Sequence, residues 1–176
     1  MRNVLLLVVF MGAILPAPRS FASTNIFTDA DADALLKLEN AGMALLGDIT
    51  DSARTVYQPN DFAEKQVNCL LELERSVEDI MRELDDARDF VELSVQMEDS
   101  RDASKINLRL AGRAVYALKA IASARKSSLN EAATCSTSAL VNTYSQKSVA
   151  LADNATAAVS AVKDRVASDR NSQDHR

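Results

Sequence analysis

The stretch from residue 70 to residue 94, LLELERSVEDIMRELDDARDFVELS, decides the fold of this chain. Its apolar and small residues fall at two heptad positions. Leu70, Val77, Leu84 and Val91 occupy one position, and Leu73, Ile80, Ala87 and Ser94 occupy the other. This spacing places one continuous stripe along an α-helix, and other helices must cover such a stripe. The stretch therefore predicts an all-α helical bundle.

The remainder of the chain also favours helix. Beyond residue 22 it has one proline, three glycines and no tryptophan, and alanine, leucine, glutamate, lysine and arginine dominate. All five are good helix formers. No segment alternates apolar and polar residues as a half-buried strand does. We expect an up-down antiparallel bundle of three to four long helices, stapled by one disulfide.

The expected helices span residues 29–57, 61–98, 103–126 and 129–168. Pro59 ends the first of them in a tight turn, because proline cannot continue a helix. The charged segment 99–102 lacks glycine and proline, so a bent continuous helix is an alternative there. Ser127 and Ser128 are expected to interrupt the third helix before the last helix begins.

Capping signals mark the expected helix starts. Thr28 or Asp29 caps the first helix. A D-x-x-E capping box at Asp61 opens the second, and an S-x-x-E box from Ser128 to Glu131 opens the fourth. In such a box, two side chains satisfy two backbone N–H groups that have no partner inside the helix.

The first 22 residues have the pattern of a secretory signal peptide. Arg2 precedes an apolar run from Val4 to Leu15, and Ser20-Phe21-Ala22 offers small residues at the positions that a signal peptidase reads. The run is shorter than the roughly 20 residues of a membrane-spanning helix, so an uncleaved anchor is the weaker alternative. We expect cleavage after Ala22 and an exported protein, periplasmic or extracellular. Its bundle domain would span 23–168, followed by a disordered polar tail at 169–176.

Charge limits the possible partners. The formal net charge is −5, and it becomes −7 once Arg2 and Arg19 leave with the signal peptide. Nucleic acid and anionic lipid both attract clustered Lys and Arg. We therefore expect no nucleic-acid partner and no general adhesion to anionic lipid. No later stretch is long and apolar enough to span a bilayer, so we also expect no stable membrane insertion after signal cleavage.

Opposite charges fall on consecutive helices. Residues 61–99 hold 13 acidic and 4 basic side chains, whereas residues 102–126 hold one acidic and six basic side chains. This favours an antiparallel hairpin, although each exposed pair contributes only about 0.2–1 kcal/mol. We interpret Lys105, Arg109 and Arg113, spaced by four, as facing the acidic second helix. An anion-binding ridge is the alternative.

Cys69 and Cys135 are the two cysteines of the chain. In an exported protein they are expected to form a disulfide, with free thiols or an intermolecular bridge as alternatives. The expected boundaries put Cys69 in the second helix and Cys135 in the fourth, which run parallel, so the two lie at one level. Those helices are diagonal in a square bundle, usually too far apart for a disulfide. We expect either a flattened bundle or a triangular core of the last three helices with the first outside.

Reactive side chains are few. The single histidine is His175 in the polar tail, and C-x-x-C, G-x-S-x-G and a phosphate-binding glycine loop are all missing from the sequence. The D-x-D-x-D run from Asp29 to Asp33 resembles the start of a calcium loop. Ala34 and Asn40 stand where that loop needs glycine and glutamate. We predict a protein that is not an enzyme and that has no catalytic, cofactor or metal site.

Three further groups of residues are candidates for a functional role. The clustered carboxylates Asp85, Asp86 and Asp89 are interpreted as a solvated helix face. The tyrosines are expected in the core or at its edge, and they are Tyr57, Tyr116 and Tyr144. Asn154-Ala155-Thr156 is a glycosylation sequon, relevant only in a eukaryotic source.

The sequences around the cysteines, Asn68-Cys69-Leu70-Leu71-Glu72-Leu73 and Thr134-Cys135, resemble those of plant invertase and pectin methylesterase inhibitors. That family is similar in outline, being exported, acidic four-helix bundles with an inter-helix disulfide. The chain lacks the family's N-terminal cysteine pair, and its two cysteines are 66 residues apart, noticeably farther than in the family. The resemblance covers two short patches and implies an inhibitor-like bundle without establishing membership.

These observations favour an exported, non-catalytic helical bundle that acts by contact with a protein partner or by self-association. A carrier of a small apolar ligand and an enzyme-inhibitor-like bundle are the alternatives. The heptad stripe of the second helix suits either an intramolecular core or a coiled-coil dimer seam.

Overall fold

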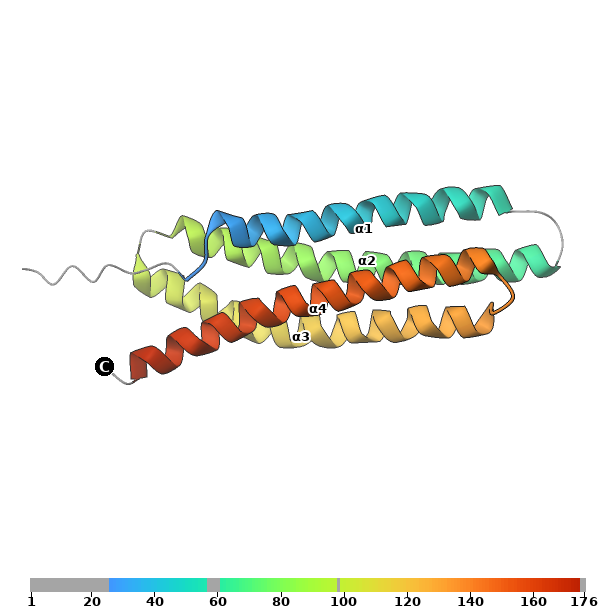
Figure 1. The fold of residues 1–176 in the computed structure, drawn as a ribbon. Coiled ribbons are helices and arrows are strands. Elements are labelled where there is room, and N and C mark those ends of the chain that lie inside the picture. The colour runs from blue at the N-terminus through green and yellow to red at the C-terminus, as the bar shows by residue number, and fades with distance from the viewer. Residues whose placement is uncertain (1–25, 57–60, 98, 175–176) are drawn as a thin grey trace, which may run out of the picture.

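The computed structural model describes residues 26–56, 61–97 and 99–174 and is all α. Four helices run alternately up and down, side by side (Figure 1): α1 Asp29–Val56, α2 Asp61–Gln96, α3 Ser100–Thr134 and α4 Ala139–Asp174. The predicted antiparallel helical bundle with one disulfide is confirmed. The signal-peptide segment, the Pro59 turn and the side chain of Asp61 lie outside the described residues.

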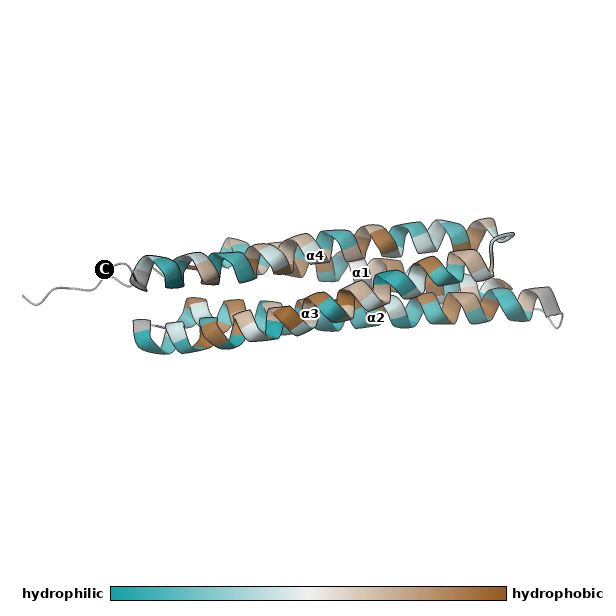
Figure 2. Cartoon of the chain, turned by 90° about the horizontal axis from the view of Figure 1, so that it is seen from below, coloured by the Kyte–Doolittle hydropathy of each residue, from teal (hydrophilic) through white to brown (hydrophobic). Residues whose placement is uncertain are grey.

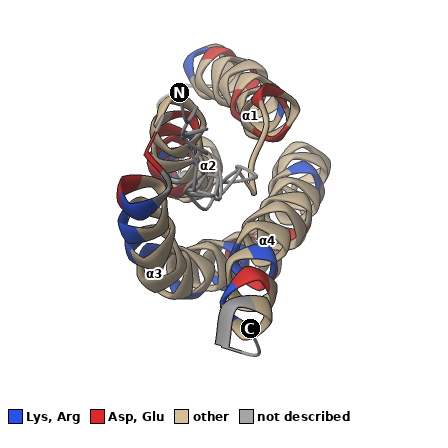
Figure 3. Cartoon of the chain, turned by 90° about the vertical axis from the view of Figure 1, so that its left-hand side faces the viewer, with Lys and Arg blue, Asp and Glu red and all other residues tan. Residues whose placement is uncertain are grey.

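Each helix packs against the next along the chain, and α4 closes the bundle by contacting α1. In addition, α2 and α4 contact each other across one diagonal. Figure 3 shows α1 and α3 at opposite corners in the view along the bundle. The cross-section is therefore a flattened square, as in the first of the two predicted arrangements.

The heptad stripe of α2 forms the centre of the core. All eight of its positions are buried, and Leu70, Leu73, Val77, Ile80, Leu84 and Val91 expose none of their surface. Burying an aliphatic side chain of this size stabilises a fold by about 1.5–3 kcal/mol. The local spacing of apolar residues therefore accounts for the central helix.

A short break separates α2 from α3. Asp99 has an extended backbone, and its carboxylate accepts a hydrogen bond of 2.7 Å from the backbone N–H of Arg101. This is N-cap geometry, which satisfies one of the free donors at the start of α3. The alternative of one bent helix through 99–102 is therefore wrong.

The expected interruption at Ser127 and Ser128 is also wrong, because α3 continues through both to Thr134. Ser128 is fully buried, and its hydroxyl lies 3.1 Å from the carbonyl of Ala124 and 2.8 Å from the Ser148 hydroxyl. A serine whose hydroxyl bonds back to the preceding turn is compatible with a helix interior. The S-x-x-E sequence from Ser128 to Glu131 is therefore not a helix start.

The last helix begins and ends later than expected. The side chain of Ser138 accepts a hydrogen bond of 3.2 Å from the N–H of Val141, which makes Ser138 the N-cap of α4. At the other end α4 continues to Asp174 instead of ending near Ser168. The segment expected to be a disordered tail is thus helical as far as residue 174.

The disulfide joins Cys69 to Cys135, as predicted, with the two Cα atoms 6.6 Å apart. Its place in the fold differs from the prediction. Cys135 is the C-cap of α3 and not part of α4, so the bridge links two neighbouring antiparallel helices. No diagonal has to be spanned, because the start of α2 and the end of α3 lie at the same end of the bundle.

Candidate functional site

The basic residues spaced by four on α3 have different environments. Arg113 faces α2, where its guanidinium pairs with Asp86 and lies 3.5 Å from the buried carboxylate of Glu83. Lys105 instead pairs with Asp102 on its own helix, and Arg109 is exposed. The interpretation that all three face α2 is therefore right for Arg113 alone.

The carboxylates at 85, 86 and 89 divide between two neighbours. Asp86 pairs with Arg113, whereas Asp85 and Asp89 both lie near Arg88, at 2.5 and 3.6 Å. Arg88 also reaches Glu39 of α1, 3.0 Å away. Burial raises the pKa of Glu39 even though the charge of Arg88 lowers it. Asp86 thus forms an inter-helix ion pair, whereas Asp85 and Asp89 are exposed and pair with Arg88 of their own helix, so the predicted solvated face is right for these two.

The two tyrosines within the described residues have opposite environments. Tyr144 is buried, and its hydroxyl lies 2.7 Å from that of Ser52 on α1. Tyr116 is 65% exposed on α3, so its expected place in or beside the core is wrong. Tyr57 and His175 lie outside the described residues, and Asn154 is exposed on α4.

The acidic start of α1 is an ordinary helix terminus with a tertiary contact. The carboxylate of Asp31 accepts hydrogen bonds from the N–H and hydroxyl of Thr28, and it pairs with Arg165 of α4 at 2.7 Å. Burial would raise the pKa of Asp31, but these hydrogen bonds and the Arg165 charge together lower it. Within the described part of the chain, no three His, Cys, Asp or Glu residues are grouped so as to hold a metal ion.

The most unusual surface is on α3, which carries two apolar stripes. The inner stripe is buried, and it comprises Ala103, Asn107, Leu110, Ala114, Ala117, Ile121, Ala124 and Ser128. The outer stripe also has steps of three and four, with one step of seven where Arg125 occupies the intervening heptad position. It comprises Leu108, Ala111, Val115, Leu118, Ala122, Leu129 and Ala132. Figure 2 shows hydrophobic residues recurring along α3 between polar ones.

The outer stripe presents large side chains to solvent. Leu108 is 51% exposed, Val115 44% and Leu129 46%. Of the eight large hydrophobic residues that are exposed in the described chain, α3 holds four, counting Tyr116 beside the stripe. Regularly spaced apolar residues on a solvated helix are typical of a surface that another element covers.

Cations border this stripe. α3 contains seven Lys or Arg and two Asp or Glu, whereas α2 contains 11 acidic and four basic residues. Figure 3 shows the basic residues along α3 and the acidic residues concentrated on α1 and α2. Within the described chain, Arg109, Lys119 and Lys126 have no carboxylate in ion-pair contact. The exposed face of α3 is therefore both apolar and cationic.

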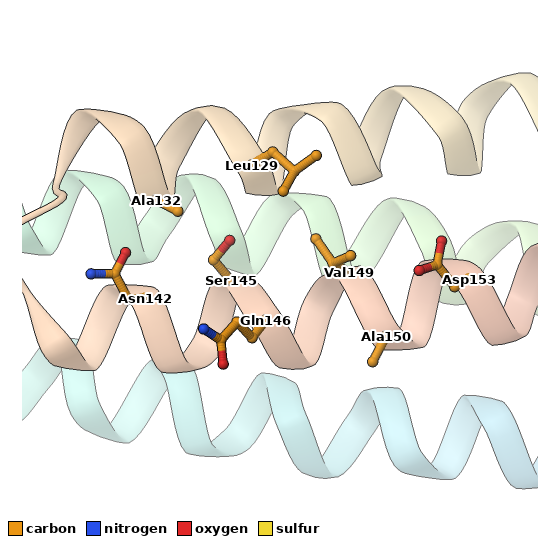
Figure 4. Close-up of a pocket in the computed structure, with 8 residues that line it drawn as sticks. All are labelled: Leu129, Ala132, Asn142, Ser145, Gln146, Val149, Ala150 and Asp153. Atoms are coloured by element: carbon orange, nitrogen blue, oxygen red, sulfur yellow. The ribbon is translucent and has the colours of Figure 1, made fainter.

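At the disulfide end of the bundle the outer stripe borders a shallow groove between α3 and α4, with a volume of about 370 Å³. Leu129 and Ala132 line it from α3, and residues 142–153 of α4 line the opposite side (Figure 4). Val149 and Ala150 contribute apolar surface to that side, whereas Asn142, Ser145 and Gln146 are polar, and the carboxylate of Asp153 is paired with Arg125. The groove is open to solvent, so an element that lies along α3 can reach it.

The outer stripe was not predicted from the sequence. Its signal was the spacing of seven between Leu108, Val115 and, two heptads on, Leu129. The spacing alone does not tell an outer stripe from an inner one, because both repeat every seven residues along the same helix. The burial of Leu110 and Ile121 identifies the inner stripe.

Fold and surface together define this protein as a disulfide-stapled four-helix bundle with an exposed apolar and cationic helix face. Comparison of the chain with known protein families, with curated protein sequences and with solved structures found no match. None of the helices among the described residues is long and apolar enough to cross a membrane.

Proposed function

We propose that this protein is an exported, non-catalytic helical bundle that acts by contact with another protein through α3. The observation that carries the proposal is the outer stripe, where Leu108, Val115 and Leu129 stand about half exposed at heptad spacing. Leaving such side chains in water forgoes hydrophobic stabilisation of about 25 cal/mol for each Å² that a partner would cover. The disulfide supports export, because disulfides persist mainly in oxidising compartments.

The experiment is crosslinking of the tagged protein in its native compartment, followed by purification and mass spectrometry. We expect one stoichiometric partner with the wild type and its loss with a Leu108→Ser, Val115→Ser double variant. Both positions are half exposed, so the variant retains the core. A Leu36→Ser, Met43→Ser variant on α1 is the matched control, since it removes exposed apolar residues from another face.

Two results would contradict the proposal. One is the recovery of no partner from either the wild type or the control. The other is turnover of a substrate that is lost when a single carboxylate is neutralised. Export is tested separately by the mature N-terminus, which we expect at Ser23.

A further inference from the structure

The proposed function leaves the chemistry of the partner open, and the α3 face constrains it. We infer that the outer stripe binds an acidic amphipathic helix, which lies along α3 and enters the groove beside α4. This inference rests on the proposed function and specifies its partner. From Leu108 to Leu129 the stripe extends roughly 30 Å, which suits a partner helix of about six turns.

The spacing of the stripe points to a helix rather than to an extended strand. Leu108, Val115 and Leu129 fall at one heptad position, and Ala111, Leu118 and Ala132 fall at the other. A helix meets its neighbour at steps of three and four, whereas a strand meets it at every second residue. Small residues at Ala111, Ala122 and Ala132 leave room for side chains of the partner helix to enter between the larger ones.

The charges beside the stripe determine the sign of the partner. Lys119 and Lys126 follow Leu108 by 11 and 18 residues, close to whole numbers of helical turns, so they share its face of α3. Neither has a carboxylate in ion-pair contact among the described residues. The Lys119 amine lies 5.9 Å from the centroid of the Tyr116 ring on the same helix. Residues that flank a helix–helix seam select the partner by opposite charge, so the partner carries Asp or Glu at its flanks.

The same charges argue against a second copy of this chain. A two-fold contact centred on the midpoint of the outer stripe would place Lys119 of one copy beside Lys119 of the other, and like charges across an interface are unfavourable. Of the two acidic helices of the chain, α2 cannot take the partner's role, because its apolar stripe is buried in its own core. A contact between α3 and the exposed Leu36 and Met43 of α1 in another copy would be head-to-tail, which leads to rings or open filaments instead of a two-fold pair. The occupant is therefore an acidic helix of a different protein.

The test reverses the charge of the bound peptide and, separately, the charge of the α3 face. Two labelled helical peptides serve as probes, with identical leucine heptads and either glutamate or lysine at the flanking positions. We expect the wild-type protein to bind the glutamate peptide about tenfold more tightly, the scale of a few exposed ion pairs. A Lys119→Glu, Lys126→Glu variant should reverse this preference. A Lys37→Glu, Arg54→Glu variant changes the net charge equally on α1 and should leave the preference unchanged.

A crosslinking experiment with the full chain identifies the natural occupant. A photoreactive side chain at Val115 is expected to link to a helical segment of net negative charge in another protein, and one at Asn40 on α1 is not. Crosslinks to a second copy or to lipid would overturn the inference, as would equal binding of the two peptides. If the native partner still binds the Leu108→Ser, Val115→Ser variant, a contact function stands, but its assignment to α3 falls together with this inference. If no partner exists at all, both fall.

Discussion

Single side chains decide where the helices begin. Ser128 and Ser138 both precede apolar residues, but only Ser138 accepts a hydrogen bond from a free N–H at a helix start. Ser128 lies in the interior of α3, where its hydroxyl meets Ser148 of α4. The difference is tertiary, because α4 provides the buried polar partner that makes serine acceptable within α3.

We predict that Ser138→Ala lowers the free energy of unfolding by about 1 kcal/mol, since it removes an N-cap. Urea unfolding followed by circular dichroism measures the effect. Ser136→Ala, two residues away in the same turn and exposed, is the control and should leave the midpoint unchanged. Equal midpoints for the two variants would show that Ser138 does not cap α4.

Glu131 lies one helical turn before Cys135 on α3, and its carbonyl accepts a hydrogen bond from the backbone N–H of Cys135. Burial raises its pKa above the ordinary value of 4.5, and the negative charge of Glu72 raises it further. The carboxyl group of Glu131 therefore binds its proton more tightly in the folded protein than in the unfolded chain. The contribution of this carboxyl group to the stability of the fold is present at acid pH. It is lost as the pH rises from 4.5 through the pKa of Glu131 in the folded protein.

Glu131→Gln is thus expected to stabilise the fold at pH 7, on the scale of a partly screened like-charge contact, roughly 0.5 kcal/mol. Little gain should remain at pH 3.5, where the unfolded and folded carboxyl groups are both mainly protonated. Thermal unfolding at the two pH values provides the comparison, with the exposed Glu78→Gln as control. The same gain at both pH values would refute the assignment.

At the scale of elements, the glycines of α1 differ in what surrounds them. A Cβ at Gly42 would lie 2.6 Å from Cγ of Met81 and 3.4 Å from Cδ2 of Leu151. At this point α1 therefore approaches both α2 and α4 closely. A Cβ at Gly47 would meet nothing within 4 Å, and that residue is exposed.

Gly47→Ala is expected to stabilise the protein by about 0.5–1 kcal/mol, because alanine favours the helix and nothing obstructs it. Gly42→Ala has the same helix propensity but forces Met81 to move. We expect it to be neutral or to cost about 1 kcal/mol, as overpacking does. Chemical unfolding of the two variants in parallel separates packing from propensity. Equal stabilisation would mean that α1 does not approach its neighbours closely at Gly42.

For the whole molecule, the disulfide closes the α2–α3 hairpin at its open end, across 66 residues of sequence. Closing a loop of this length restricts the unfolded chain. The Cys69→Ala, Cys135→Ala double variant should therefore lose about 2–4 kcal/mol while keeping its helical spectrum. Urea midpoints with and without reductant test this prediction. Reductant should lower the wild-type midpoint and leave that of the variant unchanged, and an insensitive wild type would contradict the bridge.

Much of the architecture was predictable because its causes are local. The eight heptad residues of α2 are all buried, as their spacing indicates. The antiparallel bundle and the Cys69–Cys135 pair are likewise confirmed. The helix boundaries near Ser128 were wrong, because a capping sequence does not reveal whether its serine is buried. The place of Cys135 depended on those boundaries and was wrong for the same reason.

By itself, the amino-acid sequence determined that the chain is helical, which residues of α2 are buried, and that two cysteines pair. The physical reason is that helix propensity and the three-and-four periodicity act between residues close along the chain. Only the tertiary structure decided which of the two apolar stripes of α3 faces the core and which of its cations pair with α2. It also decided that the disulfide joins adjacent helices, because these outcomes depend on how four helices share one core.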